Sequence, residues 1–322
     1  MHSYPHDSSD PFTLPGRRTR LVRRLVGALA VAALTSAPAA ALAQERTVKF
    51  GQVGSLGDVG VAESSNTGMV HVSGGLRLDT ADYFRGAFDD VPERLDEFVI
   101  GPDLSLTFEL WREGAGFLRD LSLTLGTQNG LAEQVQASDS LNNWWYESNN
   151  FVGLAARLPA DWVVGLTYTI YTSPNDVSPT FQEVALATKY TGTILGIAFN
   201  PQLKVTVPLE RDDAAFQTGV YTELALTPSI RPFGNAVSLS FPLVVGAGFD
   251  GYYGPDDDAS VHGGAGVNVG IPLAFIPRGY GRWALNVGGH VVVRDDDIRR
   301  LSTFDGGDNV ILLGKAAIGF TY

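Results

Sequence analysis

The sequence predicts an all-β protein, a single transmembrane antiparallel β-barrel of about twelve strands, and three observations lead to this prediction. Apolar and polar residues alternate in segments of about ten residues throughout residues 68–322. The connections between these segments are alternately short and long, and the long ones are acidic. No uninterrupted apolar stretch in this region approaches the roughly twenty residues that a membrane-spanning helix needs. Such a chain can cross a membrane only as a closed barrel.

Residues 1–43 read as a secretory signal peptide that is cleaved from the exported protein. Five arginines between Arg17 and Arg24 form a basic region, Leu25–Leu34 form an apolar run, and Ala41–Ala43 form a cleavage site before Gln44. The apolar run is too short to cross a bilayer as a helix. The sequence therefore predicts export, with the bacterial outer membrane as the destination.

The composition of the exported part excludes several classes of function. Removal of the leader takes away five arginines and two aspartates, which leaves 18 basic and 33 acidic residues and a net charge of −15. Nucleic-acid partners select a basic face, so none is expected. Cysteine is absent, which excludes disulfides and thiolate metal sites, and no metal ion or cofactor is predicted.

Twelve segments carry the strand pattern, in which successive side chains point to opposite faces. They are residues 70–78, 104–110, 121–126, 151–158, 162–171, 184–190, 205–209, 220–226, 237–245, 267–273, 283–293 and 310–322. Residues 44–67 contain a short candidate strand at Val48–Val53 and form a periplasmic N-terminal segment, a plug for the lumen or a further strand. The register around residues 191–202 is ambiguous, so the count is twelve or fourteen. The barrel itself is assigned to residues 68–322.

The lengths of the connections separate a membrane barrel from a soluble one. Short connections fall at residues 113–119, 159–161, 231–235 and 277–281, and long ones fall at 80–98, 128–144, 173–180, 210–216, 250–260 and 295–308. Outer-membrane barrels have short periplasmic turns and longer extracellular loops. A soluble sandwich or lipocalin-like barrel predicts an inward apolar face and no such asymmetry.

If the apolar face meets lipid, the alternate face lines the lumen. The candidate pore-lining residues on that face are Arg77, Glu109, Glu147, Arg157, Glu183, Lys189, Lys204, Glu223 and Lys315, and three histidines, His71, His262 and His290, share it. Unpaired ions are costly in a dry core, so the mixed charge indicates water-filled space. Two interpretations stay open: basic and acidic rows that set the selectivity of a narrow pore, or ion pairs that fill the lumen as structural support.

Other side chains have simpler interpretations. Trp144, Tyr146, Trp162, Trp283 and Tyr322 lie near strand ends and are interpreted as an interfacial girdle rather than a sugar-binding platform. The runs Asp256–Asp258 and Asp295–Asp297 lack the Gly and the distal Glu of an EF-hand, so solvated acidic loops are favoured over calcium sites.

No catalytic function is predicted. The chain contains no Gly-x-Ser-x-Gly turn, no His-Glu-x-x-His sequence and no phosphate-binding glycine loop between a strand and a helix. The three histidines fall on separate strands, where lumen lining is the simpler interpretation.

The last segment alternates to its end, with Ile318, Phe320 and Tyr322 on one face. This pattern suits a strand between lipid and lumen, with an aromatic residue at the interface. We expect the barrel-assembly machinery to recognise this strand through Phe320 and Tyr322, and lipid of the outer membrane to be the other partner.

Part of the chain resembles a bacterial family of TorF-like putative porins and uncharacterised outer-membrane proteins. The resemblance lies in Asp82–Gly86, which reads Asp-Tyr-Phe-Arg-Gly after the first strand, in Asn200 and Pro201 ahead of a strand, and in Tyr221, Glu223 and Leu224. The family's element has a Tyr-x-x-Arg-Gly form, and the one in this chain is one residue shorter. The resemblance implies a porin-like barrel without an established substrate.

The combined prediction is an outer-membrane, porin-like channel that lets small polar solutes diffuse passively. The alternative is a non-conducting surface or assembly protein that acts through its extracellular loops.

Overall fold

The computed structural model describes residues 66–88, 98–112, 116–132, 144–176, 178–194, 197–211, 219–233, 236–254, 258–301 and 308–322. The predicted signal peptide and nearly all of the predicted segment 44–67 lie outside the described residues. Among the described residues, no helix has the length and apolar character needed to cross a membrane.

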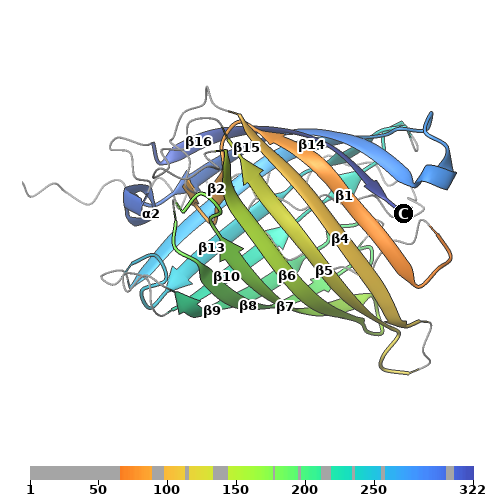
Figure 1. The fold of residues 1–322 in the computed structure, drawn as a ribbon, viewed down its shortest axis with the longest axis horizontal. Coiled ribbons are helices and arrows are strands. Elements are labelled where there is room, and N and C mark those ends of the chain that lie inside the picture. The colour runs from red at the N-terminus through yellow and green to blue at the C-terminus, as the bar shows by residue number, and fades with distance from the viewer. Residues whose placement is uncertain are drawn as a thin grey trace, which may run out of the picture. The chain divides into compact units, whose positions relative to one another are not determined.

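Twelve strands of the described chain form one closed antiparallel barrel (Figure 1). They are β1 (Val70–Asp79), β4 (Val99–Trp111), β5 (Asp120–Leu131), β6 (Trp145–Arg157), β7 (Trp162–Thr172), β8 (Phe181–Tyr190), β9 (Gln202–Arg211), β10 (Val220–Leu226), β13 (Leu243–Phe249), β14 (Ala259–Pro272), β15 (Arg282–Arg294) and β16 (Val310–Thr321). The ring closes because β1 pairs with β4 on one side and with β16 on the other. Two short strands, β11 (Ser229–Ile230) and β12 (Ser238–Ser240), extend the same sheet. The predicted all-β barrel of twelve strands is confirmed.

The outer face of the barrel is apolar and the inner face is polar. Leu154, Leu166 and Leu186 lie opposite one another on β6, β7 and β8, and their exposed fractions are 41%, 50% and 53%. On the inner face the hydroxyls of Thr107 and Thr124 are 3.0 Å apart and both side chains are buried. A continuous exposed apolar band of this kind is the surface that a membrane-spanning barrel presents to lipid.

The predicted alternation of connection lengths holds for part of the ring: residues 158–161 form a short turn between β6 and β7, but residues 191–201, between β8 and β9, form a longer connection than residues 173–180 or 212–219 on either side. The turn between β14 and β15 is short and contains η1 (Arg278–Tyr280), whereas the connection between β15 and β16 is long and contains α2 (Asp296–Leu301). Figure 1 shows α2 and the C-terminus at opposite ends of the barrel. The C-terminus therefore lies at the short-turn end.

The predicted interfacial position of Tyr146 is wrong. Trp144, Trp162 and Tyr322 are 58%, 44% and 46% exposed, but Tyr146 is fully buried. Trp145 and Glu147, which flank it, pair with the consecutive residues Leu131 and Gly130, so β6 has one extra residue at this point. A bulge of this kind reverses the alternation of side chains and turns Tyr146 into the lumen.

Candidate functional site

The first long connection was predicted to be an extracellular loop. The residues of this connection that the structure describes after β1 turn into the lumen. There β2 (Tyr83–Phe84) and β3 (Ala87–Phe88) form a small hairpin that is separate from the barrel sheet. Its two turn residues, Arg85 and Gly86, have φ values of 49° and 95°. Positive φ at both positions defines the tight type I′ turn that joins two-residue hairpins. We call residues 83–88 the lumen hairpin.

Gly86 is required at this turn for two reasons. Its positive φ is unfavourable for a residue with a side chain. A Cβ atom at this position would also lie 3.0 Å from Ile298 Cγ2 and 3.1 Å from His262. The backbone of the hairpin therefore lies so close to α2 and β14 that a side chain at this position would be crowded.

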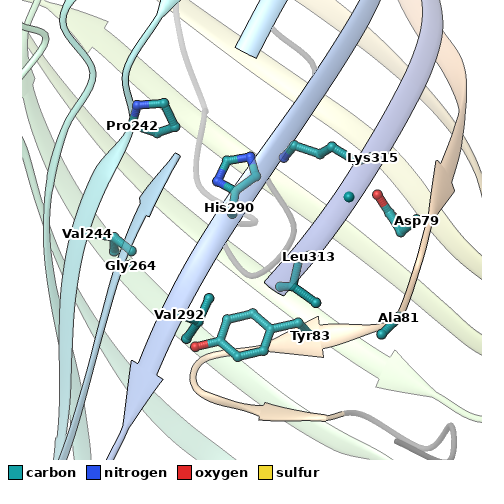
Figure 2. Close-up of a pocket in the computed structure, with 11 residues that line it drawn as sticks. Asp79, Ala81, Tyr83, Pro242, Val244, Gly264, His290, Val292, Leu313 and Lys315 are labelled. Atoms are coloured by element: carbon teal, nitrogen blue, oxygen red, sulfur yellow. The ribbon is translucent and has the colours of Figure 1, made fainter. Parts of the chain in front are cut away.

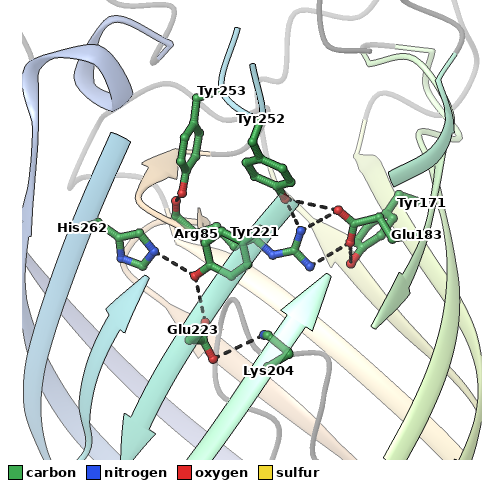
Figure 3. Close-up of polar contacts among 9 residues, drawn as sticks. All are labelled: Arg85, Tyr171, Glu183, Lys204, Tyr221, Glu223, Tyr252, Tyr253 and His262. Atoms are coloured by element: carbon green, nitrogen blue, oxygen red, sulfur yellow. Dashed lines mark hydrogen bonds and ion pairs between the residues drawn. The ribbon is translucent and has the colours of Figure 1, made fainter. Parts of the chain in front are cut away.

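Arg85, at the tip of the hairpin, forms a bidentate ion pair with Glu183 at the start of β8 (Figure 3). Its Nη1 and Nη2 atoms donate to Oε1 and Oε2 of Glu183 at 2.5 and 2.7 Å. Tyr171 donates its hydroxyl to the same carboxylate at 3.1 Å, and Tyr252 donates at 3.2 Å while accepting from Arg85. Burial raises the pKa of the Tyr252 hydroxyl, which keeps this group protonated as a donor. All the oxygens of the carboxylate are thus satisfied.

Aromatic rings enclose the guanidinium of Arg85. Its central carbon lies 4.3 Å from the centre of the Phe84 ring, 4.8 Å from that of Tyr221 and 5.8 Å from that of Tyr252. Arg85 is 3% exposed. A desolvated cation is attracted to ring faces at these distances, so the rings and Glu183 together offset the cost of burying the charge.

A second network connects the hairpin to the opposite wall. Tyr83 lies 3.2 Å from Nδ1 of His262, Nε2 of His262 lies 2.9 Å from the Tyr221 hydroxyl, and Tyr221 donates to Glu223 at 2.9 Å. Since Tyr221 gives its single proton to Glu223, it accepts from Nε2 of His262, and Nδ1 then accepts from Tyr83. Glu223 also pairs with Lys204 at 3.3 Å. Each group in this series therefore donates to the next, from Tyr83 on the hairpin to Glu223 on the wall.

The backbone and base of the hairpin are held as well. Tyr253 donates to the carbonyl of Arg85 at 2.6 Å, and Arg294 donates to that of Gly86 at 3.4 Å. Tyr146, which the bulge turns inward, donates to Asp82. Burial is the main cause of a raised pKa at Asp82, and the positive charge of Arg77 opposes it. Wall strands, the turn after β13 and the hairpin therefore form one interlocked unit.

A cavity of about 70 Å³ lies beside the hairpin, between it and the wall formed by β13 to β16 (Figure 2). Its polar lining consists of Asp79, Tyr83, His290 and Lys315, and the remainder is apolar or glycine. His290 is held by a contact of 3.0 Å between its Nε2 and Asn268. The cavity has room for a few water molecules.

The short-turn end of the lumen carries separate ion pairs. Nε2 of His71 lies 2.9 Å from Glu109, which also pairs with Arg112, and Arg157 pairs with Asp120 at 3.3 Å. These groups lie at the ends of β1, β4, β5 and β6 that are remote from the lumen hairpin.

All nine candidate pore-lining residues lie on the inward face of their strands, and several of them pair with residues outside the set. Lys204 and Glu223 form an ion pair within the set, whereas Glu183 pairs with Arg85, Glu109 with Arg112, Arg157 with Asp120 and Arg77 with Asp79. Glu147 accepts from Asn149 at 2.5 Å, Lys189 lies opposite Val163, and Lys315 lies opposite Asp79. Their role in conduction stays a prediction.

Arg85 and Tyr252 were not predicted to lie in the lumen. The signal was present in Tyr83–Phe88, where aromatic residues flank an Arg-Gly pair inside a connection that was expected to be solvated and acidic. A two-residue turn between two pairs of apolar or aromatic residues is typical of a packed hairpin.

The two aspartate runs have different outcomes. Asp256 and Asp257 lie outside the described residues. Asp295 accepts from the backbone amides of Val261 and Ile298 at 2.6 and 2.9 Å, so it caps α2. Among the described residues, no group of three or more His, Asp or Glu side chains is placed to hold a metal ion.

No protein-family model matches the sequence, and no curated protein matches it significantly. Among solved structures, the chain is similar to an outer-membrane channel from Pseudomonas putida F1, with 13% identity, a TM-score of 0.47, and coverage of 82% of this chain and 100% of that one. It is also similar to the translocator domain of the autotransporter NalP from Neisseria meningitidis (12% identity, TM-score 0.38, 80% and 89% coverage) and to outer membrane phospholipase A from Escherichia coli (13%, 0.38, 77% and 91%). The assignment of a membrane barrel rests on the chain's own apolar outer face, and the resemblance to TorF-like proteins stays an expectation.

Proposed function

We propose that the protein is a channel of the bacterial outer membrane that admits small polar solutes by passive diffusion, through a lumen narrowed by the lumen hairpin. The apolar outer band supports the membrane location. The polar inner face supports a hydrated path, because charged side chains lie on it in six or more strands, as they do in other pores. A porin-like role also agrees with the resemblance to TorF-like proteins.

The observation that carries the proposal is the ion pair between Arg85 and Glu183. It fixes a segment of the first long connection across the lumen, and a barrel of twelve strands is already narrower than the sixteen to eighteen strands of wide porins. The remaining cross-section favours small solutes. The nine candidate pore-lining residues would then tune which solutes pass, as charged side chains do in other pores.

The test is conductance across a planar bilayer that contains the refolded, signal-free protein. We expect small, ohmic conductance steps from the wild type and larger steps from the double variant Arg85→Met, Glu183→Gln, which releases the hairpin without leaving an unpaired charge. Arg300→Gln is the matched control, because this arginine is exposed on α2 and pairs with Asp297. Heat-modifiable electrophoretic mobility checks that each variant forms a barrel.

If folded wild type and double variant both fail to conduct, the channel proposal is wrong. The non-conducting surface or assembly protein then becomes the better interpretation. Unequal conductance of wild type and Arg300→Gln would show that the change does not originate in the lumen.

A further inference from the structure

Two neighbouring turns at the short-turn end expose aromatic side chains. Phe233 lies in the turn between β11 and β12, and Phe275 and Tyr280 lie in the turn between β14 and β15; their exposed fractions are 73%, 81% and 72%. The two turns are adjacent because β12 pairs with β14, with Ser238 opposite Gly270. Turns in water normally carry small polar residues, so three large exposed rings in two adjacent turns require another environment.

The same turns contain arginines and no acidic residues in the sequence. Arg231 belongs to the first turn, and Arg278 and Arg282 belong to or follow the second. No aspartate or glutamate occurs in residues 227–242 or 272–283, although the chain has 35 acidic residues. Arg278 and Arg282 are exposed. We call Arg231, Phe233, Phe275, Arg278, Tyr280 and Arg282 the aromatic–arginine patch.

The second turn is held by hydrogen bonds and continues the lipid-facing band. Tyr280 and Gly281 close η1 with backbone hydrogen bonds of 2.9 and 3.0 Å, and Trp283 donates its indole N–H to the carbonyl of Tyr280 at 2.9 Å. On the outer face of β14, Val267 and Ile271 are 46% and 37% exposed and lead toward this turn. The patch therefore lies where the hydrocarbon band ends.

We infer that the aromatic–arginine patch binds anionic phospholipid headgroups in the leaflet at the short-turn end. Aromatic rings favour the interface between hydrocarbon and water. A guanidinium matches a phosphate by paired hydrogen bonds, and basic side chains close to an anionic leaflet are attracted to it. Phe233, Phe275 and Tyr280 supply the first interaction, and the three arginines supply the second. This assignment does not depend on whether the barrel conducts.

Native mass spectrometry of the folded protein in neutral detergent tests the inference, with phosphatidylglycerol and phosphatidylcholine of the same chain length added in equal amounts. We expect the wild type to retain phosphatidylglycerol about tenfold more than phosphatidylcholine. The variant Arg231→Gln, Arg278→Gln, Arg282→Gln should lose most of this preference. Arg299→Gln, Arg300→Gln, which removes two arginines of α2 at the other end, is the matched control and should keep it.

Arg278→Gln alone serves as a second variant, because this side chain is exposed in a three-residue helix and we expect the barrel to fold without it. It should lower the preference partially. A wild type without preference, or a triple variant with the full preference, overturns the inference. Binding of poly-glutamate that equals the binding of phosphatidylglycerol also overturns it, since the patch would then recognise an acidic polypeptide.

Discussion

Glu183 on the barrel wall receives both terminal nitrogens of Arg85, at 2.5 and 2.7 Å, although 98 residues separate the two in the chain. Both side chains are buried, with 3% of each exposed. Removal of one member of a buried ion pair costs about 3–5 kcal/mol, because the other charge is left unpaired. The hairpin and the wall at β8 are therefore coupled: neither charge can be lost without a penalty at the other.

This coupling predicts strong non-additivity. Arg85→Met and Glu183→Gln should each lower the free energy of unfolding by about 3–5 kcal/mol, and the double variant should lose much less than the sum. Denaturant unfolding in lipid vesicles, followed by tryptophan fluorescence, measures these free energies. Additive losses would contradict the coupling and assign the stability of the hairpin to its other contacts.

The turn of the hairpin gives a second prediction. Gly86→Ala should destabilise the protein by about 1–3 kcal/mol, because the new Cβ combines a positive φ with a close approach to Ile298. Gly116 has a similar φ of 105°, but a Cβ added there meets no atom within 4 Å. Gly116→Ala should therefore cost less in the same unfolding experiment. Equal losses in the two variants would mean that backbone strain alone determines the effect.

Much of the barrel followed from the sequence because the alternation of side chains has a period of two wherever one face meets lipid. Leu166 and Glu183 were assigned to opposite faces for this reason, and the structure agrees. The same rule gave the wrong face for Tyr146, because a single extra residue in β6 reverses the inward and outward alternation of side chains. This extra residue does not change the composition of the segment in a recognisable way. Periodicity is local, so it does not detect a bulge that is defined by the neighbouring strand.

The contacts of the hairpin could not be derived in this way. Arg85 and Glu183 come together only when the barrel closes. The local sequence around either residue therefore does not predict that the other is its partner. The candidate pore-lining residues were identified only by the strand face on which they lie, so their ion-pair partners were not predicted. Lys204 and Glu223 pair because β9 and β10 place them opposite each other, whereas Arg157 pairs with Asp120, a residue that begins its strand and was not considered.

The carboxyl group of Asp82 predicts a pH dependence. Burial raises its pKa, against the opposing influence of Arg77 and of the hydrogen bond from Tyr146. The folded pKa therefore exceeds the unfolded value of about 3.9, so this group favours the folded state most at low pH and less as the pH rises through the folded pKa. Asp82→Asn cannot ionise and keeps an acceptor for Tyr146. Its free energy of unfolding, relative to the wild type, should rise as the pH increases above the unfolded pKa of about 3.9.

Asp296 provides a control of opposite sign. The side-chain hydrogen bond from Asn309 is the main cause of its lowered pKa, so it stabilises the folded state above its unfolded pKa and loses this effect as the pH falls. Asp296→Asn should therefore become less stable, relative to the wild type, as the pH rises. If Asp82→Asn followed the direction of Asp296→Asn, the burial of Asp82 would not control its ionisation.

The last prediction concerns the outer face. Leu166 lies near the middle of β7 and is 50% exposed, whereas Leu110 is similarly exposed, at 49%, but lies at the end of β4. An arginine costs a membrane barrel about 2–4 kcal/mol at the centre of the bilayer and about 0–1 kcal/mol near the interface. Leu166→Arg should therefore lower the free energy of unfolding in vesicles by at least about 2 kcal/mol, and Leu110→Arg should change it little. In neutral detergent, where a charged side chain can reach water more easily, the difference between the two variants should shrink. Equal losses at both positions in vesicles would mean that the hydrocarbon layer is not centred on β7 and that the band has been placed wrongly along the barrel axis.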